Sequence, residues 1–262
     1  MPIIYFIIFL FSCTLGAVVG LGGGVIIRPI LDAVGYHSIY NIAFFSSVAV
    51  LVMSLVSTSG KAKDEDGTSI DVKTAALLSM GALLGGIAGN YLFEYVIRLF
   101  QNDTVVQTIQ TVLTTVVLIL AIYFTISERF RYKLKNKTIY PFLGFILGAS
   151  AVFLGIAGGP INVPVFIVLF GMSAKQSAAY SIVIVFFSHL FRIISMGFTM
   201  GFSSFDLSFM PIILTAAIIG GAVGAVLSKR CTNKTVTVAF NITMVGLIGL
   251  NIFNIITFGL RV

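Results

Sequence analysis

The chain contains 262 residues, 58% of them hydrophobic and only 10% charged, with a net charge of +7. A soluble domain carries about 25% charged residues, because its exterior must meet water. This composition therefore excludes a soluble enzyme, a disordered chain and a nucleic-acid-binding domain. It predicts an all-α, multi-pass membrane protein whose excess apolar surface contacts lipid. The positive charge is typical of basic cytoplasmic loops, and a bacterial plasma membrane is the expected location.

Eight apolar segments are long enough to cross a membrane as helices, which takes about 20 residues. In chain order they are Ile3–Gly20, Tyr40–Ser57, Thr74–Phe93, Val105–Ile126, Ile139–Leu154, Gln176–Met196, Leu207–Leu227 and Val236–Thr257. Two shorter stretches, Gly22–Gly35 and Ala157–Gly171, each begin with a glycine-rich run and contain a proline. A helix of about 14 residues reaches only some 21 Å. Each short stretch therefore crosses with partly extended backbone or re-enters from one side.

The two halves of the chain resemble each other at a nearly constant offset of 135 residues. The matched pairs are Gly20 and Gly155, Gly23 and Gly158, Gly24 and Gly159, Ile26 and Ile161, Pro29 and Pro164, Ala43 and Ala178, Ser46 and Ser181, Val48 and Val183, Val50 and Val185, Leu55 and Leu190, Gly85 and Gly220, Gly86 and Gly221, and Gly89 and Gly224. Duplication explains them best. We expect a first membrane repeat over 1–128, a basic cytoplasmic linker over 129–138 and a second repeat over 139–262. The Gly85–Gly89 pattern is typical of close helix packing.

The charges of the loops favour one arrangement of these repeats. An odd number of crossings in each half makes the halves inverted, and an even number makes them parallel. With the linker in the cytoplasm and Arg28 left aside, five crossings in each half place twelve cations inside and three outside. Eight crossings with re-entrant glycine stretches place ten inside and five outside. The positive-inside rule favours inverted repeats of about five crossings each, built from eight long helices and two short broken segments. Eight crossings remain the alternative.

The two glycine stretches have a composition suited to binding an anion. Glycine runs break a helix and let backbone approach a ligand closely. A helix that restarts after them offers unpaired N–H groups and the positive end of its dipole. The candidate backbone positions are Gly22, Gly23, Gly24, Gly158 and Gly159. Asn162 and the hydroxyl groups of Ser46, Ser47 and Ser181 can donate further hydrogen bonds.

Four ionisable side chains fall within or beside apolar segments, where charge is costly and therefore indicates function by default. Arg28 and Asp32 are four residues apart, and His189 and Arg192 are three apart, so each pair shares a helix face. Arg28 or Arg192 would supply positive charge to an anion. Alternatively, Arg28 and Asp32 neutralise each other, and Arg192 extends to the interface. We expect neither a metal nor a cofactor, because the sequence has no ligand spacing for one.

Two motifs, GLGGGVIIRPIL at Gly20–Leu31 and GIAGGPINVPVF at Gly155–Phe166, resemble those of the TauE/SafE sulfite exporters, also called TSUP transporters. The resemblance covers nearly the whole chain. It implies a secondary transporter of sulfite, sulfonates or related organosulfur anions. The second motif departs from the first at Ala157, where the first half has Gly22, and at Pro160. The identity of the anion therefore stays open.

Broken helices in a duplicated chain favour alternating access at a site near the middle of the membrane. The alternative is a passive anion channel, or a permease for another small carboxylate or oxyanion. An intramembrane enzyme is disfavoured, because the apolar segments offer no paired carboxylates or activated nucleophile. The expected partners are a small anion, lipid and, as a candidate coupling ion, the proton, with Asp32 and Glu94 as the available acids. No nucleic acid is expected, and the oligomeric state is left open.

The charge distribution predicts the sidedness of the linker, with both termini outside. In a variant without Cys13 and Cys231, a single cysteine at Lys133 or Lys135 should react with an impermeant maleimide only in inside-out vesicles. Labelling of either position in right-side-out spheroplasts would contradict the inverted arrangement.

Overall fold

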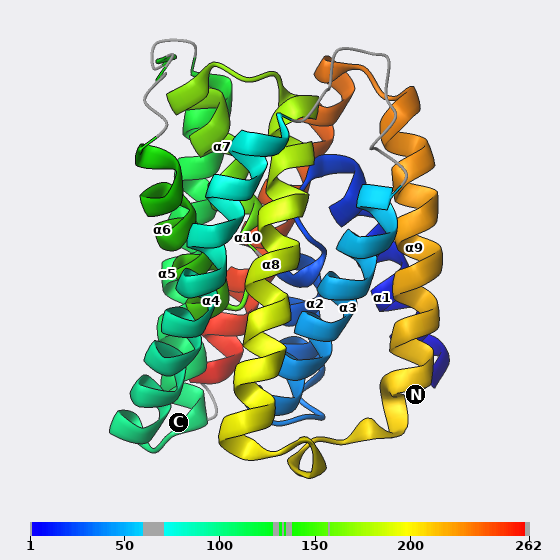
Figure 1. The fold of residues 1–262 in the computed structure, drawn as a ribbon. Helices are drawn as coiled ribbons and strands as arrows, with labels where there is room; N and C mark the ends of the chain where they lie inside the picture. Colours follow the sequence, from blue (N-terminus) through cyan, green and yellow to red (C-terminus); the bar gives the residue numbers. More distant parts are fainter. Residues whose placement is uncertain are drawn as a thin grey trace.

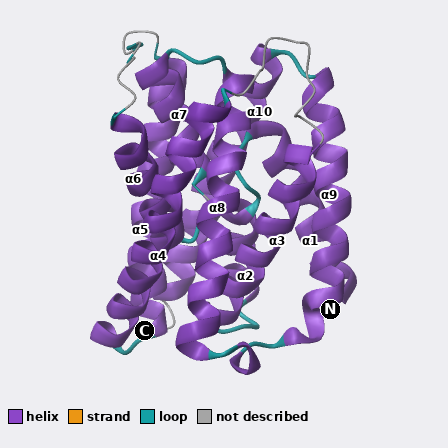
Figure 2. Cartoon of the chain, in the orientation of Figure 1, coloured by secondary structure: helices purple, strands orange, loops and turns teal. Residues whose placement is uncertain are grey.

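The computed structural model describes residues 2–59, 71–127, 131–132, 134, 138–156 and 158–259. The regular structure of these residues is entirely helical (Figure 2). The elements are α1 (Pro2–Val19), α2 (Gly24–Val34), α3 (Ile39–Ser59), α4 (Val72–Phe100), α5 (Asp103–Ile126), α6 (Ile139–Leu154), α7 (Gly159–Phe170), α8 (Ala174–Met200), the 3-10 turns η1 (Phe202–Ser204) and η2 (Leu207–Phe209), α9 (Met210–Arg230) and α10 (Asn233–Gly259). The predicted all-α fold is confirmed. Most of the 129–138 linker, including Lys133 and Lys135, lies outside the described residues, as does Ala157.

Seven of the described helices are long and apolar enough to cross a membrane: α1, α3, α4, α5, α8, α9 and α10. The helix α6 has the predicted bounds, but its 16 residues give a length of only about 24 Å. The described residues therefore contain seven long helices rather than the predicted eight, together with three shorter ones, α2, α6 and α7. A multi-pass membrane protein follows from this set of apolar helices.

Two of the predicted spans end at Phe93 and begin again at Val105, but the residues between them are mostly helix. The helix α4 continues to Phe100, and α5 begins at Asp103 after Asn102, whose side chain accepts hydrogen bonds from two backbone N–H groups. The extension is possible because Glu94 is buried between helices, where its carboxylate accepts hydrogen bonds from Asn90 and Thr199. The predicted span ended before Glu94 because a charged side chain is costly in lipid. In the structure, Glu94 faces protein instead.

The two glycine stretches form helical hairpins rather than extended crossings. The 11 residues of α2 and the 12 of α7 span only about 16–18 Å as helices, so neither crosses the hydrocarbon region alone. The chain enters through α1 and returns through α2 to the same end, where the rings of Tyr5 and His37 lie 5.6 Å apart. It enters again through α6 and returns through α7, where the rings of Tyr140 and Phe170 lie 5.2 Å apart. Each half therefore contains one such hairpin and three further long helices, and the number of crossings stays a prediction.

The ends of the hairpins lie on opposite sides of the bundle. Figure 1 places both chain termini at one end, together with the connection between α8 and α9. At this end the backbone N–H of Asp206 donates to the side chain of Asn41 at the start of α3. The starts of α8 and α10 meet at the other end, where the N–H of Lys175 donates to Asn233. The closed ends of the two hairpins therefore point toward each other inside the bundle.

Glycines let the two halves pack closely against each other. A side chain at Gly85 or Gly89 of α4 would overlap the backbone of α6, and one at Gly220 or Gly224 of α9 would overlap the backbone of α1. Small residues at spacings of four allow such backbone contact in a membrane, where packing replaces the hydrophobic effect. The packing role predicted for these glycines is confirmed, and each half is held mainly by the other.

Adding one methyl group should separate the packing role of glycine from its effect on helix propensity. Gly85→Ala forces the backbone of Phe145 to move and should cost about 1–3 kcal/mol through overpacking. Gly249→Ala gains the same propensity in α10, but its methyl group meets nothing within 4 Å. Thermal unfolding in detergent should show a lower Tm for Gly85→Ala and an unchanged or higher Tm for Gly249→Ala. Equal shifts would contradict the packing assignment.

Candidate functional site

The closed ends of the two hairpins meet in the interior of the protein. We call residues 20–23 the first tip and residues 155–158 the second tip. A side chain at Gly159, directly after the second tip, would overlap the backbone of Gly20 and Leu21 in the first. The helices α2 and α7 begin at this junction after Gly23 and Gly158, and neither start has a side-chain cap. Two helix N-termini without side-chain caps therefore approach each other from opposite hairpins.

Glycine is required at the start of both short helices. Gly23 has φ +69° and Gly158 has φ +74°, in the left-handed region that other residues adopt only with strain. The backbone reverses direction here within a few residues. The spacing of glycines in the sequence therefore encodes the shape of the tips.

Two of the predicted donors, Ser181 and Asn162, lie at this junction. The hydroxyl of Ser181 on α8 donates to the carbonyl oxygen of Gly20 at 2.7 Å, and the side-chain amide of Asn162 donates to the Ser181 oxygen at 3.3 Å. Both residues are fully buried, and the Asn162 side-chain oxygen has no hydrogen-bond partner among the described residues. The amide of Asn162 retains a second N–H. The junction therefore brings together polar groups that carry no formal charge.

The predicted serines of α3 are turned elsewhere in this conformation. The hydroxyls of Ser46 and Ser47 both donate to the carbonyl oxygen of Ala43, at 3.2 and 2.7 Å. Both side chains are buried. A rotation about χ1 would be needed before either hydroxyl could donate to a ligand.

Arg28 binds the protein itself. One of its terminal nitrogens donates to the carbonyl oxygen of Leu154 at 2.7 Å, and the other donates to the side chain of Gln110. The Gln110 amide in turn donates to the carbonyl oxygen of Phe153. Arg28 therefore ties α2 to α5 and to the last turn of α6. This arrangement does not favour the prediction that Arg28 supplies charge to an anion.

Arg192 differs from Arg28 in its hydrogen bonds. Its side chain is fully buried, and none of its three guanidinium nitrogens has a hydrogen-bond partner among the residues described. The guanidinium carbon lies 5.5 Å from the centre of the Phe93 ring. The neighbouring His189 is also buried, and both of its ring nitrogens lack partners there. Arg192 does not extend to the interface, and a buried charge without a partner costs several kcal/mol.

Arg192 belongs to a polar stripe that follows α8. Its buried members, at spacings of three, four, seven or more residues, are Ser177, Ser181, Ser188, Arg192 and Ser195. Such spacings place the side chains on one helix face. Asn90 of α4 joins the stripe by donating to Ser195 at 3.1 Å. A face that is polar along its length can guide an ion past apolar neighbours.

The predicted residues therefore form three groups rather than one. The first is the junction of the tips with Ser181 and Asn162, the second is Arg28 with its protein partners, and the third is Arg192 with His189. Gln110 and Asn90 were not predicted. Both are buried polar residues within apolar helices, which is the signal that could have revealed them.

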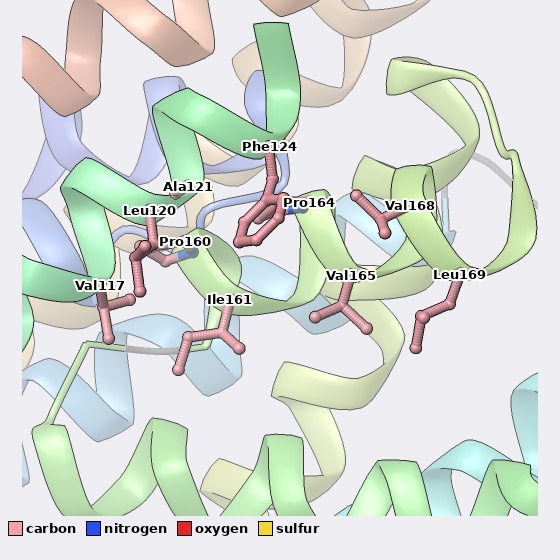
Figure 3. A pocket seen from close by; sticks show the side chains of 10 residues that line it. All are labelled: Val117, Leu120, Ala121, Phe124, Pro160, Ile161, Pro164, Val165, Val168 and Leu169. Carbon is pink, nitrogen blue, oxygen red and sulfur yellow. The ribbon is translucent and has the colours of Figure 1, made fainter. Parts of the chain in front are cut away.

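A separate cavity of about 320 Å³ opens between α5 and α7 (Figure 3). Its lining is apolar, from Val117, Leu120 and Phe124 on α5 to Pro160 and Pro164 on α7. The rings of both prolines face this cavity. It offers no donor to an anion, so it is not the candidate site.

Apolar helices that surround two buried glycine tips and several buried polar side chains are the arrangement expected of a membrane transporter. The chain belongs to the sulfite exporter TauE/SafE family, whose model matches residues 5–252. The probable membrane transporter protein YunE of Bacillus subtilis (strain 168) is 24% identical over 269 aligned residues, which cover 93% of this chain and 94% of YunE. No solved structure matches the chain. The protein is therefore a multi-pass transporter of the cell membrane and not an enzyme.

A substitution in one of the tips should impair transport by more than its backbone strain alone would cause. Gly158→Ala places a methyl group against Ala151 and Asn162, at a φ of +74°. We expect normal membrane insertion and loss of most sulfite uptake in proteoliposomes. Gly201→Ala also places a side chain at a positive φ, +75°, but its methyl group meets only the Ser203 hydroxyl oxygen, at 3.7 Å, and it should retain uptake. Normal transport by Gly158→Ala would count against a role for the tips.

Proposed function

We propose that the protein is a secondary transporter of small sulfur oxyanions, such as sulfite or an organic sulfonate, that works by alternating access. The observation that carries this proposal is the unpaired guanidinium group of Arg192 in the interior. A charge left uncompensated there is costly. A bound oxyanion would supply the missing opposite charge and accept charge-assisted hydrogen bonds. The name of the family adds sulfite as the first anion to test.

We also infer that the two halves are inverted repeats, an arrangement that many alternating-access transporters share. Contacts that recur at the offset of 135 residues support this: the approach of Gly86 to Ser188 recurs as that of Gly221 to Met53. In the same way, the approach of Gly85 to Phe145 corresponds to that of Gly220 to Leu10.

The helices α3 and α8 are equivalent in this relation and run in opposite directions. The buried side chains of Val50 and Val185, themselves 135 residues apart in the sequence, form one small cluster between them. A residue that packs against its own repeat equivalent lies on the symmetry axis of a two-fold arrangement. Such an axis lies in the membrane plane when the repeats are inverted.

The proposed anion pathway has two stations along α8. Ser181 and Arg192 are eleven residues apart, which is about 16 Å of helix, so one small oxyanion cannot contact both. The charged station consists of Arg192 and His189. The uncharged station is the junction of the tips, with Asn162 and Ser181. Ser46 and Ser47 belong to it after their hydroxyls turn from Ala43.

A pathway with two separate stations suits transport better than a single site that binds the anion tightly. The charged station attracts the anion and excludes cations. The uncharged station binds it through backbone and side-chain donors alone, each helix terminus contributing about 0.3–1 kcal/mol when exposed. Binding there is weak enough for release. Because the tips contact each other through glycine, a small movement of one hairpin opens or closes the junction.

Substitution of Arg192 tests the proposal. In proteoliposomes loaded with sulfite or methanesulfonate, the parent should show counterflow of the external labelled anion. Arg192→Gln should reduce the rate of counterflow at least tenfold, because it removes the positive charge that binds the anion. A tenfold loss corresponds to about 1.4 kcal/mol. Arg98→Gln, which removes a side chain that is 79% exposed, should leave the rate unchanged.

Two further results would decide against parts of this scheme. A passive channel would let the labelled anion equilibrate without a transient excess inside the vesicles. That result would exclude alternating access. If Arg28→Gln abolishes counterflow at unchanged Tm while Arg192→Gln does not, Arg28 and not Arg192 holds the anion. We expect Arg28→Gln to lower the Tm instead, because it removes the hydrogen bond to Leu154.

A further inference from the structure

A buried carboxyl group beside Arg28 has no role in the pathway described so far. Asp32 of α2 is 4% exposed, and its Oδ1 atom has no hydrogen-bond partner in the described parts of the chain. Its Oδ2 atom lies 3.7 Å from the Nε atom of Arg28, too far for a hydrogen bond. The terminal nitrogens of Arg28 donate to Leu154 and Gln110 instead. Asp32 is therefore close to a cation and yet poorly satisfied by it.

A small polar cavity adjoins this carboxyl group. Its volume is about 10 Å³, which is close to the room that one water molecule needs. Its polar lining comes from Arg28, Asp32, Gln110, Thr111, Thr114 and Asn251. Hydroxyl and amide groups of this kind can accept a hydrogen bond from a protonated carboxyl or from a water molecule.

Arg28 is the charged group that faces Asp32. The neighbouring helices α1, α3 and α6 contain no charged residue. The charged residues of α5 and α10 are Asp103 and Lys234, which lie at the first and second positions of their helices. Gln110, Thr111 and Thr114 are two to three turns farther along α5, and Asn251 is near the other end of α10. Among the described residues, Arg28 is therefore the one charged group placed to compensate a change of charge on Asp32.

We propose that Asp32 is the site at which a proton binds and couples to anion transport. This inference rests on the proposed function, because a coupling site presupposes a transported anion. A proton that enters through the water-sized cavity binds Oδ1, which becomes an O–H donor toward the cavity. No covalent bond other than this O–H forms, and the same proton leaves when the cavity faces the other side.

The coupling follows from the net charge of the pair. Arg28 and ionised Asp32 sum to zero, and protonation of Asp32 leaves a net charge of +1 inside the protein. A positive interior favours the anion, and by linkage the bound anion favours protonation to the same extent. Anion and proton therefore bind together and leave together.

Glu94 is the other buried acid among the described residues, and its environment is different. Its Oε1 atom accepts hydrogen bonds from Asn90 at 2.8 Å and from Thr199 at 2.9 Å. Its Oε2 atom lies 3.8 Å from the exposed Arg98. These partners satisfy a carboxylate, and they join α4 to α8. Glu94 therefore has a structural role.

Two transport assays with methanesulfonate, which stays ionised throughout the useful pH range, separate coupling from transport. Counterflow requires the anion to cross in both directions but no net movement of protons. Accumulation driven by a pH gradient requires coupling, and a gradient of one unit supports up to about tenfold accumulation for one proton per anion. The parent should perform both. Asp32→Asn should retain counterflow, while its accumulation ratio falls to about 1.

Asp206→Asn is the matched control, because it removes a carboxylate in the connection outside the long helices. Ser208 donates hydrogen bonds to this carboxylate and lowers its pKa. Asp206→Asn should retain both activities. Accumulation by Asp32→Asn at the parental level would overturn the proposal, as would loss of coupling in Glu94→Gln with coupling intact in Asp32→Asn.

The outcomes also distinguish this inference from the proposed function. If the parent shows counterflow but ignores the pH gradient, the proton site is refuted and the transporter stands. If the parent shows no counterflow, the proposed function itself fails.

Should Asp32→Asn lose both activities, proton uptake by the detergent-solubilised protein decides. Methanesulfonate added in weak buffer should cause proton uptake by the parent and by Asp32→Glu, reported by a pH-indicator dye. Asp32→Asn should show none. Equal proton uptake by parent and Asp32→Asn would overturn the proposal.

Discussion

Polar backbone groups cannot be left unpaired in hydrocarbon, and this constraint determines where the chain can break its helices. The first tip is tolerated because protein surrounds it: the Ser181 hydroxyl donates to the carbonyl oxygen of Gly20, and Gly159 lies against Leu21. Each tip is thus enclosed by elements of the opposite half. The requirement to bury irregular backbone brings the two hairpins together, and the same requirement creates the junction where donors converge.

The two halves share a backbone plan but differ in charge. Arg28 has Val163 at the equivalent position of the second half, and Arg192 has Ser57 at that of the first. Both arginines therefore act without a symmetric counterpart. Arg28 holds α2 against α5 and α6, while Arg192 has no hydrogen-bond partner among the described residues. The two arginines therefore differ in their surroundings as well as in their position in the repeat pattern.

The sequence predicted most of the helices and the packing role of Gly85 and Gly89, because these features depend on composition or spacing. It did not predict that α4 continues through Glu94, since the partners of that carboxylate, Asn90 and Thr199, include one from a distant helix. It also could not separate Arg28 from Arg192. Both are cations in apolar segments, and only the fold shows which one meets the carbonyl oxygen of Leu154. Spacing along one helix is visible in a sequence, whereas partners from other helices are not.

The packing of α1 against α9 also sets an order of assembly. At about 5–20 residues per second, α9 leaves the ribosome roughly 10–40 s after α1, because roughly 190 residues separate them. The partner of α4, by contrast, is the next but one helix in the chain, α6. The contact of α4 with α6 can therefore form early. The face of α1 that packs against Gly220 and Gly224 stays exposed to lipid until α9 has been inserted. During synthesis, this exposed face of α1 is the surface most in need of protection by the insertion machinery.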